Sequence, residues 1–75
     1  MTRYALSELT AGQEFELSGA TLRVELVSPL AVAALVLRGV CRGCRPGQTV
    51  YLDPRDSSGR DVLVVLLGGD PPEAA

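Results

Sequence analysis

Two cysteines are the residues of this chain whose type and spacing most resemble a chemical site. Cys41 and Cys44 form a C-x-x-C inside the stretch RGVCRGCRPG, residues 38–47. Zinc takes four ligands in proteins, and a C-x-x-C supplies two of them. The chain has no histidine and no further cysteine, so a zinc or iron site within one chain would need carboxylates such as Asp53 or Asp56, which is uncommon for structural zinc. The alternative is two chains that each contribute both cysteines. Such a site would lie across a dimer axis.

The same cysteine pair has two other interpretations, thiol–disulfide chemistry and a structural turn. Arg42 and Arg45 would lower the pKa of a neighbouring thiol and favour its reactive thiolate form. A thioredoxin-like pair, however, follows a βαβ pattern at a helix N-terminus, and this sequence shows neither. Glycine and proline are also what a turn between two strands requires. We therefore favour a turn, and we expect no resident cofactor.

A second candidate site is a group of five arginines in the middle of the chain. They outnumber the two aspartates of residues 38–60, although the whole chain has a net charge of -2. No phosphate-loop fingerprint is present, and Tyr51 is the only nearby aromatic residue that could stack on a base. Anion or nucleic-acid binding is therefore an alternative. We favour pairing of the arginines with Glu14, Glu16 and Glu25 on a neighbouring strand or subunit. The five are Arg38, Arg42, Arg45, Arg55 and Arg60.

The chain has few groups suited to catalysis. Without histidine, acid–base chemistry would need carboxylates whose pKa values are pushed apart. Asp53, Asp56 and Asp61 lie in or beside a turn-rich segment, where aspartate commonly bonds the backbone. Residues 57–59, SSG, have no neighbouring base that could activate a serine. We expect a protein that is not an enzyme.

Alternating polarity predicts that strands position these residues. Gln13–Leu17 and Thr21–Val27 place apolar and charged side chains on opposite faces around a Ser18-Gly19 turn, which is typical of an antiparallel hairpin. Residues 48–53 alternate in the same way and predict a half-buried strand. Residues 60–67 predict a strand that is apolar on both faces, typical of a central position in a sheet or of an interface.

The segment Leu30–Leu37 fits two kinds of element. Ser28, Pro29 and Gly39 frame it as they would frame a helix, with an N-cap, a first-turn proline and a terminal glycine. The segment has no polar residue, however, and a helix that is apolar all round needs cover on every side. A strand needs cover on only two faces. We therefore favour a strand.

Together these elements predict an all-β fold, either a small SH3-like barrel or a strongly bent antiparallel sheet of four or five strands. Residues 5–13 add a short helical turn. Closure of the sheet would protect the edges of such aliphatic strands. We expect one β domain over residues 1–69 and a disordered tail over residues 70–75, where glycine and proline cannot continue a strand.

Two short motifs are similar to those of a known family. LSELTAG, residues 6–12, and GCRPGQTV, residues 43–50, resemble the opening L-x-x-L-x-x-G and the later G-x-x-P-G-x-x-V of FeoA-type domains. The resemblance implies an SH3-like barrel and a role as a ferrous-iron transport accessory or a metal-linked regulator. The chain lacks the Arg/Leu-rich segment that precedes the second motif in that family.

Size and composition favour a function through contact with another protein. A 75-residue chain is near the lower limit for a self-sufficient core, yet 47% of its residues are hydrophobic. We expect a non-catalytic interaction or assembly module that self-associates or docks on a larger protein through aliphatic strand faces. The residues predicted to make this contact are Leu30, Val32, Leu35, Leu37, Val62, Val64 and Leu66.

The sequence predicts no membrane span. Its first residues lack the basic start and apolar core of a signal peptide. The longest apolar runs, residues 30–37 and 62–67, are far shorter than the roughly 20 residues that cross a bilayer. We expect a cytoplasmic protein with reduced cysteines.

Overall fold

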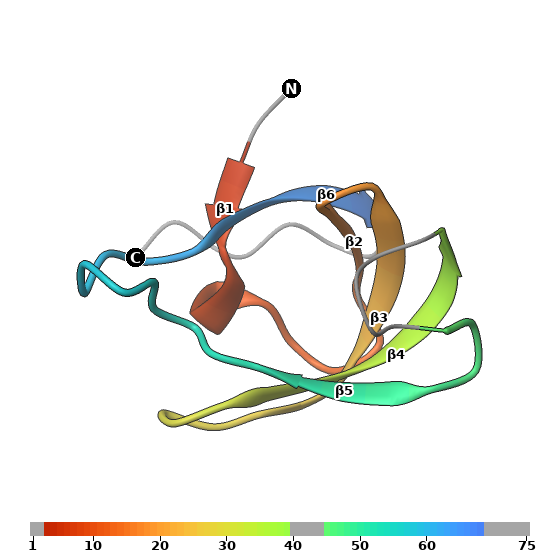
Figure 1. The fold of residues 1–75 in the computed structure, drawn as a ribbon, viewed down its shortest axis with the longest axis horizontal. Helices are drawn as coiled ribbons and strands as arrows, with labels where there is room; N and C mark the ends of the chain where they lie inside the picture. Colours follow the sequence, from red (N-terminus) through yellow and green to blue (C-terminus); the bar gives the residue numbers. More distant parts are fainter. Residues whose placement is uncertain (1–2, 40–44, 69–75) are drawn as a thin grey trace.

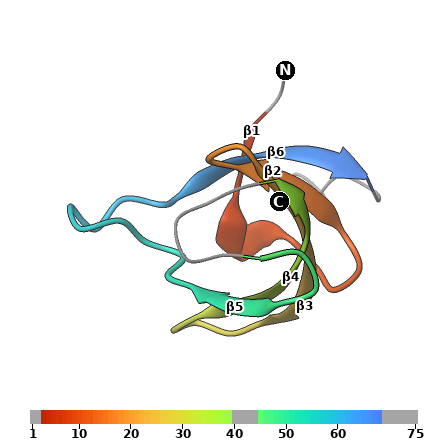
Figure 2. The same cartoon turned by 45° about the vertical axis from the view of Figure 1, so that its right-hand side comes forward.

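A computed structural model describes residues 3–39 and 45–68, which form one antiparallel sheet (Figure 1). Its strands lie in the order β1-β6-β2-β3-β4-β5. The sheet bends strongly, so that β6 and β5 lie on opposite sides of the molecule in both views (Figures 1 and 2). The elements are β1 (Arg3–Ala5), the 3-10 helix η1 (Leu6–Glu8), β2 (Glu14–Leu17), β3 (Ala20–Val27), β4 (Val32–Gly39), β5 (Thr49–Leu52) and β6 (Leu63–Gly68).

The predicted all-β, bent antiparallel fold is confirmed, with six strands instead of four or five. The additional strand is β1, which pairs with β6 and is too short to show an alternating pattern in the sequence. The β2–β3 hairpin and the short helical turn are also confirmed. The predicted tail, residues 70–75, lies outside the described residues. The boundary of the domain at residue 69 is therefore still a prediction.

The ambiguous segment Leu30–Leu37 is a strand, as favoured. β4 lies between β3 and β5, and its core-facing residues Val32, Ala34 and Val36 are fully buried. On the outer face, the hydroxyl of Thr49 donates a hydrogen bond of 2.8 Å to Glu25. Because these two residues belong to β5 and β3, the bond crosses the outer face of β4. The core therefore covers one face of this apolar strand, and the Thr49–Glu25 hydrogen bond lies over the other, without a surrounding layer of helices.

Buried apolar side chains from five of the six strands and from η1 fill the core, and all of them except Phe15 are aliphatic. Phe15 is its largest member and is fully buried at the centre of β2. Each such side chain stabilises the fold by roughly 1.5–3 kcal/mol through removal from water. The other fully buried large residues are Leu6, Val24, Val32, Val36 and Val64.

Two turns with the same construction lead into β2 and β5. Each ends in Gly-Gln, at residues 10–13 (TAGQ) and 45–48 (RPGQ), with the glycine at positive φ. In each, the N–H of the glutamine donates to the carbonyl of the first residue, and the glutamine Oε1 accepts from that residue's N–H. Glycine at the third position and alanine or proline at the second are what a type II turn favours.

The four strands β2 to β5 have an approximate internal two-fold symmetry, which the strand pairing reveals. A rotation that exchanges β3 with β4 also exchanges β2 with β5, and it carries one Gly-Gln turn onto the other. The rotation superposes core-facing residues on core-facing residues. The corresponding pairs are Phe15–Leu22 with Val50–Ala34, Leu17–Ala20 with Leu52–Val32, and Glu14–Arg23 with Thr49–Leu35.

Candidate functional site

The segment with the two cysteines that could hold a metal lies outside the described residues. Cys41, Cys44 and Arg42 all belong to residues 40–44. In the described ranges, no group of three or more acidic, cysteine or histidine side chains is arranged to hold a metal ion. Metal binding and thiol chemistry at Cys41 and Cys44 therefore stay predictions.

The other four predicted arginines do not form one surface. Arg45 precedes β5, whereas Arg55 and Arg60 belong to the loop that follows it. Figure 1 shows these segments at opposite ends of β5. Arg38 lies near the Arg45 end, because β4 residue Val36 bonds the Gly-Gln turn. The arrangement therefore divides the positive charge into two separate pairs.

Two side chains of the predicted Arg–Glu pairing, Arg38 and Glu25, form hydrogen bonds with hydroxyl groups of the same chain. Arg38 Nε donates to the hydroxyl of Thr21, at 3.5 Å, because Thr21 lies between Arg38 and Glu16 in the sheet. Glu25 accepts its bond from Thr49. Within the chain, these two hydrogen bonds involve short hydroxyl side chains of neighbouring strands. Pairing of the arginines with glutamates of another subunit stays a prediction.

The loop between β5 and β6 is organised around the carboxylate of Asp56. Its Oδ1 accepts hydrogen bonds from the Ser58 hydroxyl at 2.6 Å, the Ser58 N–H at 2.9 Å and the Arg60 N–H at 3.0 Å. The Ser58 hydroxyl, followed by the Arg60 N–H, lowers the pKa of Asp56 below its ordinary value. The Arg55 guanidinium donates to the Gly59 carbonyl at 3.3 Å across the same loop. These contacts give Asp56 and Arg55 a structural role in the turn.

The structure places the predicted contact residues at different depths, and several of them face the core. Val32 and Val64 are buried, and Val62 and Leu66 pack against the core from a partly buried position. Successive residues of a strand point to opposite faces, so the outward residues of β6 are the alternate set. Of the remaining predicted residues, Leu30 is exposed, and Leu35 and Leu37 are half-buried on β4.

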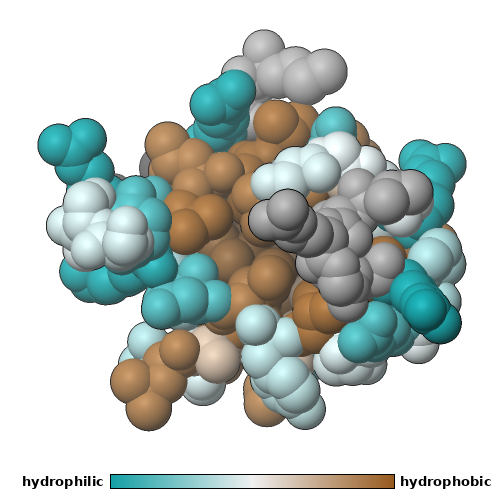
Figure 3. Space-filling view, in the orientation of Figure 1, coloured by the Kyte–Doolittle hydropathy of each residue, from teal (hydrophilic) through white to brown (hydrophobic). Residues whose placement is uncertain are grey.

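The outward face of β6 carries an apolar stripe, which we define as Leu63, Val65 and Leu67. Leu63 is 54% exposed and Leu67 is 44% exposed, whereas Val64 between them is 1% exposed. Figure 3 shows hydrophobic surface over the upper and central part of one face of the molecule. The stripe is a run of three outward aliphatic residues on one strand, and both of its leucines are exposed.

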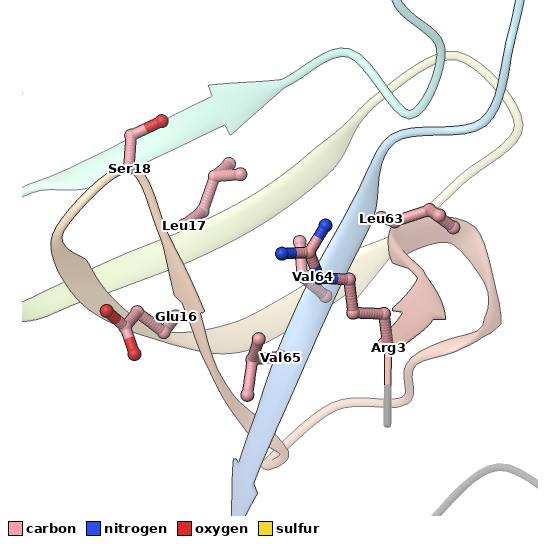
Figure 4. Close-up of a pocket in the computed structure, with 7 residues that line it drawn as sticks. All are labelled: Arg3, Glu16, Leu17, Ser18, Leu63, Val64 and Val65. Carbon is pink, nitrogen blue, oxygen red and sulfur yellow. The ribbon is translucent and has the colours of Figure 1, made fainter. Parts of the chain in front are cut away.

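Two opposite charges flank the middle of this stripe. Val65 pairs with Arg3 of β1 on one side and with Glu16 of β2 on the other. Both charged residues are exposed, and Figure 4 shows them on opposite sides of β6. An open hollow of about 250 Å³ lies beside them. It is lined by Arg3, Glu16, Leu17, Ser18, Leu63, Val64 and Val65.

A second exposed apolar group lies near the β3–β4 turn. Leu26 of β3 and Tyr51 of β5 are 65% and 78% exposed and lie on either side of Ala33 in β4. Leu30, in the turn, is also exposed. These residues come from three different elements, and no pair of opposite charges flanks Ala33 in their row.

The described part contains no helix of the length and apolar character that crossing a bilayer requires. Comparison with protein families, with curated proteins and with solved structures finds no match to this chain.

Proposed function

We propose that this protein is a non-catalytic assembly module that works by self-association through the apolar stripe of β6. The observation that carries the proposal is the outward exposure of Leu63 and Leu67 on a strand held between two neighbours. β6 pairs with β1 over Leu63–Val65 and with β2 over Val65–Gly68. Its backbone is therefore held along its length, and it presents these side chains in a fixed arrangement. A fixed apolar surface is suited to contact with another protein.

The energetics support burial of this stripe. Complete burial of a leucine side chain is worth roughly 1.5–3 kcal/mol relative to exposure. The chain leaves two leucines of β6 about half exposed, even though a domain of 75 residues has little apolar area to spare for its own core. Association would bury part of this exposed apolar surface. The arginines, divided between the two ends of β5, support anion binding less well.

Sedimentation velocity tests this proposal directly. We expect the average mass of the wild type to rise above the 7.9 kDa of one chain as its concentration increases. The double variant Leu63→Gln/Leu67→Gln should stay at that mass, because two polar amides replace the apolar stripe. The matched control is Leu26→Gln/Leu30→Gln, which makes the same change in the second exposed group and should associate like the wild type.

Two results would contradict the proposal. One is a wild type that keeps the mass of a single chain up to about 0.5 mM, a concentration at which even weak specific contacts become populated. The other is an unchanged association of the Leu63→Gln/Leu67→Gln variant. Loss of association in the Leu26→Gln/Leu30→Gln control alone would move the contact to the β3–β4 turn.

A further inference from the structure

We infer that two copies of this chain pack stripe to stripe about a two-fold axis parallel to β6, so that Arg3 of each copy pairs with Glu16 of the other. This inference rests on the proposed function and adds the partner and its orientation. It starts from one row of the sheet, Arg3–Val65–Glu16, in which an apolar residue separates two opposite charges.

The three side chains of this row point to the same face. Residues that lie directly opposite each other in antiparallel strands project to the same side of the sheet. Val65 points outward because its neighbours Val64 and Leu66 face the core. Arg3 and Glu16 are exposed, in agreement with that direction. Their backbones are two strand spacings apart, roughly 10 Å.

This row is self-complementary for only one of the two simple face-to-face arrangements. A two-fold axis that runs across the strands, above Val65, places Arg3 over Arg3 and Glu16 over Glu16. An axis that runs along β6 exchanges the two sides of the strand and places Arg3 over the partner's Glu16. The second arrangement forms two opposite-charge contacts and keeps Val65 over Val65. Closed two-fold dimers are the commonest form of protein self-association.

The geometry of sheet packing is compatible with this arrangement. Sheets that pack face to face lie about 10 Å apart with their strands nearly aligned. At that distance the long side chains of arginine and glutamate reach across, while the shorter leucines and valine of the stripe meet in the centre. A centre of aliphatic residues with charges at its rim is the usual organisation of a protein interface.

The small size of the stripe sets the expected strength of the dimer. Three outward residues along β6 span about 14 Å, so the contact is smaller than the roughly 800 Å² per partner of a standard interface. We therefore expect a weak dimer, with a dissociation constant on the order of 10–100 µM. In a contact of this size, the two rim pairs determine orientation, and added salt should weaken association.

Charge reversal provides a sharp test, measured by sedimentation velocity at low ionic strength. In a dimer of the Arg3→Glu variant, the introduced glutamate would lie opposite the partner's Glu16 at both symmetric contacts. In a dimer of the Glu16→Arg variant, the introduced arginine would lie opposite the partner's Arg3. We expect each single variant to associate about tenfold or more weakly than the wild type. An equimolar mixture of the two should recover association, because one chain then carries two acidic groups and the other two basic groups at the rim.

Two further variants serve as controls. Arg3→Glu/Glu16→Arg exchanges the charges within one chain and should associate like the wild type. Arg60→Glu changes the net charge as much as Arg3→Glu does, but at an exposed residue of the loop between β5 and β6. It should leave association unchanged. Urea unfolding of every variant should give a wild-type midpoint, since all the substituted side chains are exposed.

The outcomes separate this inference from the proposed function. If both single variants associate like the wild type while Leu63→Gln/Leu67→Gln does not, the stripe mediates assembly and the two-fold arrangement is wrong. Failure of the mixture to associate more strongly than either single variant also rejects the arrangement. A wild type that never associates rejects both. Recovery in the mixture and in the exchanged double variant supports the arrangement.

Discussion

Asp56 illustrates how a single side chain can hold a loop without burial. Its one oxygen atom Oδ1 accepts three hydrogen bonds from residues two and four positions further along the chain. Aspartate followed by serine and glycine commonly forms such turns, and the sequence predicted a backbone role for this residue on that basis. These hydrogen bonds confirm the prediction. The role could be predicted from the sequence because every contact involved is local.

The pH dependence of stability should show this role. The hydroxyl of Ser58, and after it the N–H of Arg60, lowers the pKa of Asp56 in the folded state. Stabilisation by the carboxylate is thus complete above its unfolded pKa, about 3.9, and is lost as the pH falls through the lower folded value. Ser58→Ala should raise the Asp56 pKa toward 3.9, as measured by the carboxyl carbon shift in an NMR titration.

Ser57→Ala is the matched control for this titration, because Ser57 is exposed in the same loop. It should leave the Asp56 pKa unchanged. An equal effect of the two alanine variants, or no effect of Ser58→Ala, would contradict the assignment of the Ser58 hydroxyl as the main cause. Urea unfolding between pH 6 and pH 2, followed for both variants, would show the same difference in stability.

At the scale of elements, the sequence predicted strands well and their outward faces less well. Periodicity identified β2 and β3, because charged residues alternate with apolar ones there. β6 is apolar at every position from Leu63 to Leu67, so its pattern carries no information on which residues face inward. The position of β6 between β1 and β2 decides that question, and only tertiary structure supplies it.

The close contact at the end of β4 is another element-scale feature, and it requires glycine at position 39. Gly39 has φ of 96°, and a side chain there would meet the Gly19 carbonyl oxygen and lie 2.7 Å from the Ala20 Cα. Gly39→Ala should therefore cost about 3 kcal/mol or more, the sum of backbone strain and overlap with a neighbouring backbone. Urea unfolding measures this loss.

Gly12→Ala separates the two contributions. Gly12 has nearly the same φ, 94°, but nothing lies within 4 Å of where its Cβ would be. Its substitution should cost only about 1–2 kcal/mol, the price of the left-handed conformation. Equal losses of stability in the two variants would show that the contact with Gly19 and Ala20 adds nothing.

At the scale of the whole molecule, the internal two-fold symmetry of β2 to β5 could not be found in the sequence. The rotation exchanges the first strand of the unit with the last, so corresponding residues do not follow one another in the same order. A search for tandem repeats therefore finds none. Two features of the sequence still reflect the symmetry. They are the two Gly-Gln dipeptides and the apolar residues at corresponding alternate positions of the exchanged strands.

The same symmetry predicts a stabilising substitution. Ala11 in the first Gly-Gln turn corresponds to Pro46 in the second, at the position where type II turns favour proline. Ala11→Pro should raise the free energy of unfolding by about 0.5–1 kcal/mol, because proline reduces the entropy of the unfolded chain. The reverse change, Pro46→Ala, should lower it by a similar amount. Destabilisation by Ala11→Pro would mean that the two turns are not equivalent.

The strand order also determines when the β6 surface forms during folding. Strands β2, β3 and β4 pair with their immediate neighbours in the chain, whereas β6 must join β1 and β2, which come from the other end of the described sequence. Contacts between distant segments pay a loop-closure cost and form late. The row Arg3–Val65–Glu16 brings together three such segments, so its charges and its apolar centre adjoin only after β6 has docked. A partner that binds this row therefore binds only the folded chain and not an isolated segment of it.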